Sequence, residues 1–441
     1  MRLTVTAVVL VFAVAAAGLT VARRGSHDGP VARTAAAAAV ERVGSVPPNA
    51  TTAQRLTALR AVVRAAPDRA DGWTLLAAAE LQRVRETGDA SSYVRAQGDV
   101  DRALSLRPGD QAALTQRAAL ELSRHDFRAG LRDAQAAHAV DPTVVLPYGP
   151  LVDAAVELGR YGDADRYAQQ MVDRKPDLSA LARVSYLREL RGDRVGALDL
   201  LRAAQSAGGE VPENTAYVTT LAAGLELQAG ALADARRDAR EALHRFPRYA
   251  AAEAALAKVQ AAGGDLGGAI ARLRGVVARL PLPEHVTLLA ETELVAGDRA
   301  AAAQDLDVVR AERALQRSAG VITDTESAIF EADHGDPAQA VTLARRAWAA
   351  APSVRSADAL GWALARAGRA REGLVWARRA LARGWRDPLA TSHAGLAALA
   401  AGDDAAAHVW LRDAARGGAF LGPWQAARVR AGLRTLTERS A

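Results

Sequence analysis

One phrase returns along this chain at intervals of 33 to 38 residues. It reads Gly-Asp, then Ala about five residues later and a second Ala seven residues after that, often followed by Pro; two copies are GDRVGALDLLRAAQ and GDLGGAIARLRGVVARLP. A period of this length is typical of stacked helical arrays, in which each unit buries its apolar face against its neighbours. The repeat therefore predicts an all-α fold, and it indicates a protein that binds other molecules.

The phrase is expected to form a helix, a turn and a second helix. Glycine can take the left-handed conformation that ends a helix, and the aspartate after it can cap the next helix. Proline then closes the unit because it cannot continue a helix. The ten turns of this phase lie at Gly88, His125, Gly159, Gly192, Gly230, Gly264, Gly297, Gly335, Gly368 and Gly402. The capping aspartates are Asp89, Asp126, Asp193, Asp265, Asp298, Asp336 and Asp403, and the closing prolines are Pro108, Pro142, Pro176, Pro247, Pro281 and Pro352.

Three copies of the repeat carry insertions. They read SSYVRAQ at 91–97, SAGGEVPENT at 206–215 and QRSAGVITD at 316–324. The Gly-Asp turn that recurs in the copies is explained by the fold. A specific function is therefore to be sought where the copies differ. These insertions and the aromatic and arginine residues of the first helices are the main differences.

The phased copies resemble the tetratricopeptide repeat family over about residues 70–420. The unit DGWTLLAAAELQ keeps the opening Trp73, Leu76 and Ala77 of the family signature, whereas most other units lack that tryptophan. The resemblance implies a right-handed superhelical solenoid of about ten repeats with a concave, ligand-binding inner face. We expect an amino-terminal capping helix in 51–69, the array in 70–421, and a carboxyl-terminal capping helix and tail in 422–441.

The resemblance places partner contacts on the inner face of the first helices. Aromatic and arginine side chains are the usual anchors of interfaces, and Trp362 is the foremost candidate. The candidates for a partner-binding groove are Tyr186, Glu189, Tyr217, Gln228, Lys258, Glu291, Arg355, Asp358, Trp362 and Arg366.

The composition argues against several other functions. The chain has no cysteine, which excludes disulfides and thiolate metal sites. Its 56 Lys and Arg residues are interspersed with 50 Asp and Glu residues, whereas nucleic-acid binding favours clustered positive charge. No phosphate-binding loop, nucleophile elbow or paired-histidine zinc motif occurs. We therefore expect no enzyme activity, cofactor, metal or nucleic-acid partner.

The amino terminus carries an apolar run, LTVTAVVLVFAVAAAGLTVA, from Leu3 to Ala22. Its length suits a membrane-spanning helix, and AVAAAG could also supply a signal-peptide cleavage site. Residues 1–24 are thus either an anchor or a cleaved signal, followed by a linker at 25–50. Arg2 and the pair Arg23-Arg24 flank the run, so orientation is open; we expect the repeats outside the cytoplasm or secreted, with a cytoplasmic location as the alternative.

These features predict a non-enzymatic interaction scaffold, membrane-anchored or exported, that holds a peptide or protein partner in its groove. One alternative is a chaperone or assembly factor for exported proteins, because LRAVVRAAPDRADGWTLLAAA also resembles the repeats of cytochrome c maturation chaperones. The other alternative is an envelope enzyme whose site has no recognised motif.

Overall fold

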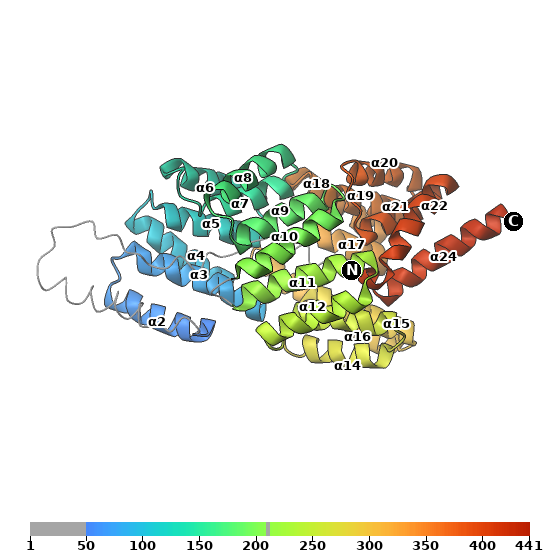
Figure 1. The fold of residues 1–441 in the computed structure, drawn as a ribbon, viewed down its shortest axis with the longest axis horizontal. Coiled ribbons are helices and arrows are strands. Elements are labelled where there is room, and N and C mark those ends of the chain that lie inside the picture. The colour runs from blue at the N-terminus through green and yellow to red at the C-terminus, as the bar shows by residue number, and fades with distance from the viewer. Residues whose placement is uncertain (1–49, 209–211) are drawn as a thin grey trace, which may run out of the picture.

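The computed structural model describes residues 50–208 and 212–441, and every regular element in these residues is a helix. A single helix, α2 (Thr52–Ala65), precedes ten antiparallel helix pairs, and the short α23 (Gly418–Leu421) and the long α24 (Pro423–Ser440) follow them (Figure 1). The pairs are α3 (Ala70–Thr87) with α4 (Ser91–Leu106), α5 (Gln111–Ser123) with α6 (Phe127–Val140), α7 (Tyr148–Glu157) with α8 (Tyr161–Arg174), α9 (Leu178–Glu189) with α10 (Arg194–Ala207), α11 (Pro212–Ala229) with α12 (Leu232–Arg245), α13 (Ala250–Ala262) with α14 (Leu266–Val277), α15 (Pro283–Ala296) with α16 (Arg299–Ser318), α17 (Asp324–His334) with α18 (Pro337–Ala350), α19 (Val354–Arg366) with α20 (Ala370–Leu381), and α21 (Pro388–Ala401) with α22 (Asp404–Arg416). The predicted all-α repeat array is confirmed.

The turn within each pair has the predicted chemistry. Eight of the glycines have φ between 68° and 93°, and His125, in the glycine place, has φ 63°. The aspartate side chains accept a backbone N–H of the following helix at Asp126, Asp193, Asp265, Asp298, Asp336 and Asp403. Gly335 differs, because its φ is −141°.

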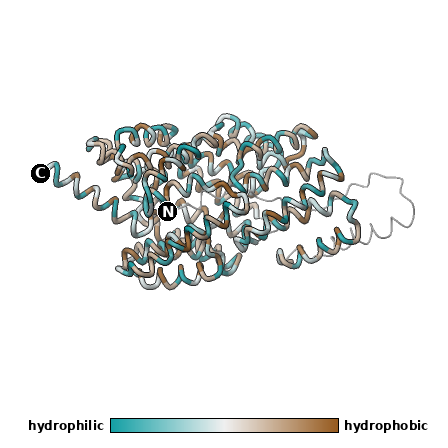
Figure 2. The backbone as a smooth tube through the Cα atoms, turned by 180° about the vertical axis from the view of Figure 1, so that it is seen from behind, coloured by the Kyte–Doolittle hydropathy of each residue, from teal (hydrophilic) through white to brown (hydrophobic). Residues whose placement is uncertain are grey.

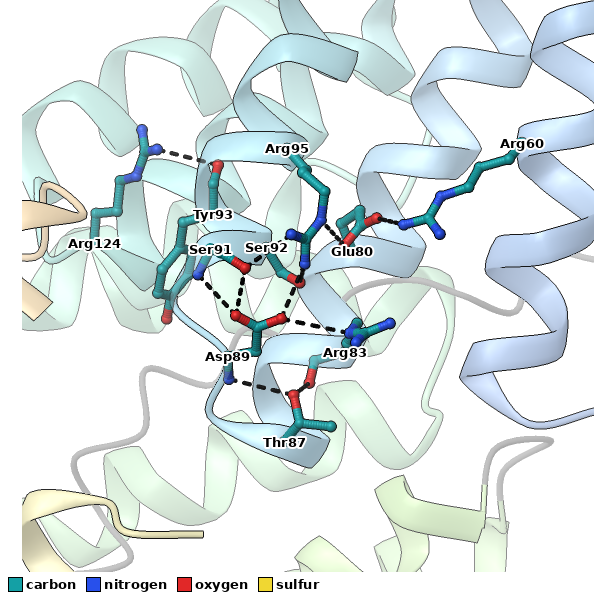
Figure 3. A network of polar contacts seen from close by, with 10 residues as sticks. All are labelled: Arg60, Glu80, Arg83, Thr87, Asp89, Ser91, Ser92, Tyr93, Arg95 and Arg124. Atoms are coloured by element: carbon teal, nitrogen blue, oxygen red, sulfur yellow. Dashed lines mark hydrogen bonds and ion pairs between the residues drawn. The ribbon is translucent and has the colours of Figure 1, made fainter. Parts of the chain in front are cut away.

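Asp89 also differs, because the first insertion shifts the start of α4. Its side chain accepts the N–H of Ser91, 3.0 Å away, and pairs with the guanidinium of Arg95. Arg95 also bonds Glu80, which Arg60 holds from α2. Figure 3 shows this network, which ties α2, α3 and α4 together at the start of the array.

Small residues let the paired helices approach closely, as predicted. The alanines at the crossing points, such as Ala118, Ala223 and Ala340, have no exposed surface. In the pair α19 and α20, Gly361 and Gly373 face each other, and a Cβ on Gly361 would lie 3.0 Å from the carbonyl oxygen of Gly373. The second helices of the pairs, such as α12 and α20, are amphipathic, whereas first helices such as α11, α15 and α21 are buried on nearly all sides. Figure 2 shows polar and apolar residues mixed along the array.

The amino-terminal apolar run, Leu3 to Ala22, lies outside the described residues. Among the helices that the structure describes, none has both the length and the hydropathy needed to cross a bilayer.

The array winds so that its first half touches its second half in a fixed register. The turn inside each of the first five pairs packs on the loop that follows the pair five places later in the chain, and Arg128, just after the second turn, also reaches the end of α18 in the eighth pair. Contacts across this junction join residues that lie far apart in the sequence. For example, the amide of Val354 donates to the hydroxyl of Tyr161, 193 positions earlier, at 2.9 Å. We call this junction the seam; it joins residues 88, 124–128, 159–161, 192–194 and 230 to residues 280–282, 322, 349–354, 384–386 and 416.

Backbone groups make much of the seam. The amide of Ile322 donates to the carbonyl of Arg124 at 2.8 Å, and its carbonyl lies 2.9 Å from Nδ1 of His125. Arg128 donates to the carbonyls of Ala349 and Ala350, both at 2.9 Å. These bonds satisfy loop groups that would otherwise need water, so they join the two halves into one body.

At two of the seam turns, glycine is required for a second reason besides its conformation. A Cβ on Gly159 would collide with the carbonyl oxygen of Pro352, and one on Gly192 with that of Gly384. By contrast, a Cβ on Gly368 or Gly402, in the second half, would meet nothing within 4 Å. The same residue therefore has a different role in the two halves.

Candidate binding site

The structure buries most of the ten predicted groove residues inside the protein. Glu189, Tyr217, Gln228, Lys258, Glu291, Asp358 and Trp362 are buried, Tyr186 and Arg355 are half-buried, and Arg366 is exposed. The resemblance predicts an open concave face, but here the winding of the array and the carboxyl-terminal helices cover much of that face. The role of these residues as partner contacts stays a prediction.

The inner face of the second half holds helix α24. The side chain of Asp333, with no exposed surface, accepts hydrogen bonds from Trp362 at 3.1 Å and from Gln425 at 3.2 Å, and pairs with Arg428 at 2.7 Å. Trp424 packs on the ring of His334, with centroids 4.7 Å apart. Two α24 anchors, Trp424 and Arg428, one helical turn apart, therefore seat the helix on this face.

Trp362 lies at the centre of this surface. Its ring stacks on His393 with centroids 4.5 Å apart and planes 7° from parallel, and the guanidinium of Arg428 lies 4.8 Å from its centroid. Asp358 holds His393 from the other side through Nδ1 at 3.0 Å. Trp362 is therefore sandwiched between His393 and Arg428 and contacts a helix of its own chain, and its predicted role as a partner contact stays a prediction.

A second set of predicted residues forms polar pairs between helices of adjacent repeat units. The amide of Gln228 donates to Glu189 at 2.8 Å, which joins α11 to α9. Arg355 lies 3.6 Å from Glu326, and the charges of Glu157 and Glu326 hold the pKa of its guanidinium above the usual range. Nε2 of His334 lies 3.1 Å from Glu291. These residues connect helices of different pairs.

Glu189 gives the stability of the protein a pH dependence of defined sign. Burial raises the pKa of Glu189 from 4.5 to about 7, against the opposing hydrogen bond from Gln228. The folded chain therefore holds this proton more tightly than the unfolded chain does. The stabilisation that comes from this tightly held proton is complete below about pH 4.5 and is lost as the pH rises through 7. The free energy of unfolding falls over this range by up to about 3 kcal/mol.

Urea denaturation at about pH 5 and about pH 8, on the native chain and on Glu189→Gln, measures this effect. The glutamine carries no charge at either pH, so the variant should lose part of the pH dependence and gain stability relative to the native chain at the higher pH. An identical pH dependence in both proteins would mean that Glu189 is ionised in the folded state throughout.

The part of the inner face that stays open is a cavity of about 500 Å³. Its wall is formed by residues of α3, α4, α5, α11, α13, α15, α16, α17 and α23, so both halves of the array surround it. All three insertions reach it: Tyr93 comes from the first, Glu213 from the second, and Gln316 and Thr323 from the third. The segments in which the repeats differ therefore converge on one place.

The polar groups of the cavity wall are set in a mainly apolar surface. Glu213 lies 3.8 Å from Arg85 and accepts a hydrogen bond from Gln82 at 3.3 Å. Burial raises the pKa of Glu284, and it lowers the pKa of His285 to about 4, an effect that the charge of Lys258 increases. At neutral pH the imidazole of His285 is therefore uncharged.

Sequence reasoning named two residues of this wall, Tyr217 and Lys258, and missed the others. The missed residues that carry charge are Arg85, Glu86, Glu213, Arg248, Arg279, Glu284, Arg313 and Glu326. The signal available in the sequence was the position of the three insertions, each of which contributes residues to the wall. In the part of the chain that the structure describes, no group of three or more His, Asp or Glu side chains is placed to hold a metal ion.

No protein-family model and no curated protein matches the chain. Among solved structures, it is similar to PilW, a widely conserved type IV pilus biogenesis factor (16% identity, 46% of this chain and 92% of PilW, TM-score 0.39), and to a tetratricopeptide repeat protein from Parabacteroides merdae (15%, 54% and 95%, 0.39). A human IFIT1 dimer with m7Gppp-AAAA is also similar (13%, 89% and 96%, 0.47). The likeness is one of helical-repeat architecture.

Proposed function

Since the chain is an array of the tetratricopeptide type, we propose that it is a non-enzymatic scaffold that binds a helical segment of a protein partner on the inner face of its second half. The observation that carries this proposal is α24, because that face already holds a helix by Trp424 and Arg428. Helix-in-groove recognition uses anchors one helical turn apart in this way. The partner segment exchanges with α24.

The contacts of α24 define what such a segment should offer. Asp333 is fully buried and is held by Arg428, so an occupant that replaced α24 has to supply a cation there. Removing one partner of a buried pair is strongly destabilising. His334 needs a flat ring in the place of Trp424. The partner helix is therefore expected to carry an aromatic residue and, four positions later, an arginine.

We propose further that the apolar run at 3–22 tethers or exports the array, with the repeats outside the cytoplasm. The length of the apolar run supports a membrane-spanning or export segment. The short segment before the run supports this orientation, whereas arginines on both of its flanks favour neither side. A reporter fused after Ala441 identifies the side of the membrane on which the array lies.

Weakening α24 should increase partner binding. The double variant Trp424→Ala and Arg428→Ala removes both anchors, and the lost pair with Asp333 alone should shift the docking equilibrium of α24 by on the order of 100-fold. A photo-cross-linking amino acid in place of the exposed Arg366, beside Trp362, reports occupancy of the face in membranes. The yield of cross-linked partner should rise several-fold in the double variant.

Arg439→Ala is the matched control, because Arg439 pairs with Asp404 at 2.6 Å near the exposed end of α24, away from the Asp333 contacts. Its cross-linking yield should equal that of the native chain. An unchanged or reduced yield in the double variant, with the array still folded, would contradict the exchange. Cross-links to one protein support the scaffold, whereas cross-links to many unfolded proteins support the chaperone alternative.

A further inference from the structure

The cavity has the size and lining of a small-molecule site, separate from the face that holds α24. A volume of about 500 Å³ lies within the range of pockets that hold small ligands. Leu280, Leu288 and Phe420 make apolar parts of its wall, and a small number of polar groups interrupt them. Such a combination gives affinity from the apolar surface and orientation from the polar groups.

The space reaches the backbone of α11 at Gly224. This residue is buried, yet a Cβ added to it would meet nothing within 4 Å. Glycine is unfavourable in the middle of a helix, and at Gly224 no neighbouring helix needs the room. The free space beside a buried helical glycine therefore belongs to the cavity.

The charges of the wall favour an anion. Five cationic side chains line it, at Arg85, Arg248, Lys258, Arg279 and Arg313, against four carboxylates, at Glu86, Glu213, Glu284 and Glu326. Two of these nine side chains pair with residues outside the wall, Arg279 with Glu253 and Glu326 with Arg355. Burial favours the neutral form of Glu284, which makes the wall more positive.

Lys258 brings a positive charge to the apolar end of the cavity. Its ammonium lies 5.1 Å from the ring centroid of Phe420, and it is close enough to His285 to shift the titration of that imidazole. A neutral imidazole carries one N–H that can donate to an anion. An ammonium and an N–H donor thus stand beside Leu288 and Phe420, where an apolar chain can lie.

We propose that this cavity binds a small amphipathic anion, with its carboxylate or similar monoanionic head at Lys258 and its apolar body along Leu288, Phe420 and Gly224. The site does not depend on the proposed exchange of α24. The closing of the array around it supplies the apolar wall, and the insertions supply polar groups on its other sides.

Calorimetric titration of the full chain with octanoate tests the proposal, with octylammonium and octanol as the cationic and neutral analogues. Octanoate should bind with a dissociation constant on the order of 0.1 mM, as expected for a ligand of this size, and at least tenfold more tightly than either analogue. Lys258→Met should weaken octanoate at least tenfold and leave the binding of octanol unchanged. Anionic vesicles added in place of octanoate distinguish a membrane headgroup from a free anion; binding of the vesicles alone would overturn the proposal.

Gly224→Phe tests whether octanoate binds in the space beside α11. The phenylalanine side chain would fill this part of the cavity and should abolish octanoate binding. Gly98→Phe is the matched control, since Gly98 is an exposed glycine of α4 with nothing within 4 Å of its Cβ position, and it should bind octanoate as the native chain does. If Gly224→Phe unfolds at a lower temperature than the native chain, Gly224→Leu is used in its place. Equal affinity for octanoate and octylammonium, or unchanged octanoate binding in a folded Gly224 variant, would overturn the proposal.

Discussion

Gly159→Ala should lower the free energy of unfolding by roughly 2–5 kcal/mol, and Gly368→Ala by only about 1–2 kcal/mol. Both glycines occupy the same place in the repeat and have left-handed φ values, 68° and 78°. Both variants therefore share the conformational penalty of a side chain in this region. Only at Gly159 does the new Cβ also meet the backbone of Pro352 across the seam, and this carbonyl lies in a loop that the seam holds.

Urea denaturation of both variants, followed by circular dichroism, gives the difference. Gly402→Ala serves as a second control, because its φ is 80° and its Cβ position is also open. Equal losses at Gly159, Gly368 and Gly402 would mean that the turns of the first half are as free as those of the second half, and that the seam contributes nothing to stability.

Arg183→Met should be the other change with a large effect. Nε and Nη2 of Arg183 bond the two carboxylate oxygens of Asp153 at 2.9 and 2.7 Å, and the two side chains are 1% and 3% exposed. Burial raises the pKa of Asp153 to about 7 even though Arg183 lowers it. Without the guanidinium, the carboxyl group is left buried without compensation, which is expected to reduce the stability by about 3–5 kcal/mol.

Arg117→Met is the matched comparison. Arg117 bonds Asp133 in the same two-pronged geometry, at 2.8 and 2.7 Å, but the pair is 32% and 16% exposed. Water can replace the lost contact there, so the change should reduce the stability by less than about 1 kcal/mol. If Arg183→Met is as mild as Arg117→Met in urea denaturation, the interior between α7 and α9 is wetter than the structure indicates.

The local parts of the fold could be predicted from the sequence because their causes are local. A glycine such as Gly192 ends a helix by its own conformation, and the side chain of Asp193 caps the next helix by accepting the N–H of Gly196, three residues later. The register of the seam has no such local cause. Gly159 and Gly368 look alike in the sequence, and the five-pair offset between the contacting turns and loops results from small rotations summed over many helix packings.

The candidate site could be predicted only in part for the same reason. The sequence predicts Trp362 as a groove residue, but it gives no sign that α24 covers this ring, because Trp424 and Arg428 look like ordinary surface residues of a capping helix. The insertions were the best guide to the cavity. A helix pair of the repeat forms without these inserted residues, so we expect the inserted residues to have a role outside the pair.

The central claim is that the two halves of the array are locked together, and hydrogen exchange of two amides tests it most directly. The N–H groups of Ile322 and Val354 donate across the seam, to the carbonyl of Arg124 and the hydroxyl of Tyr161. Both should exchange as slowly as amides inside the neighbouring helices, and in Gly159→Ala they should lose that protection before the helices do. Exchange of both amides at the rate of an unprotected loop in the native chain would contradict a closed seam.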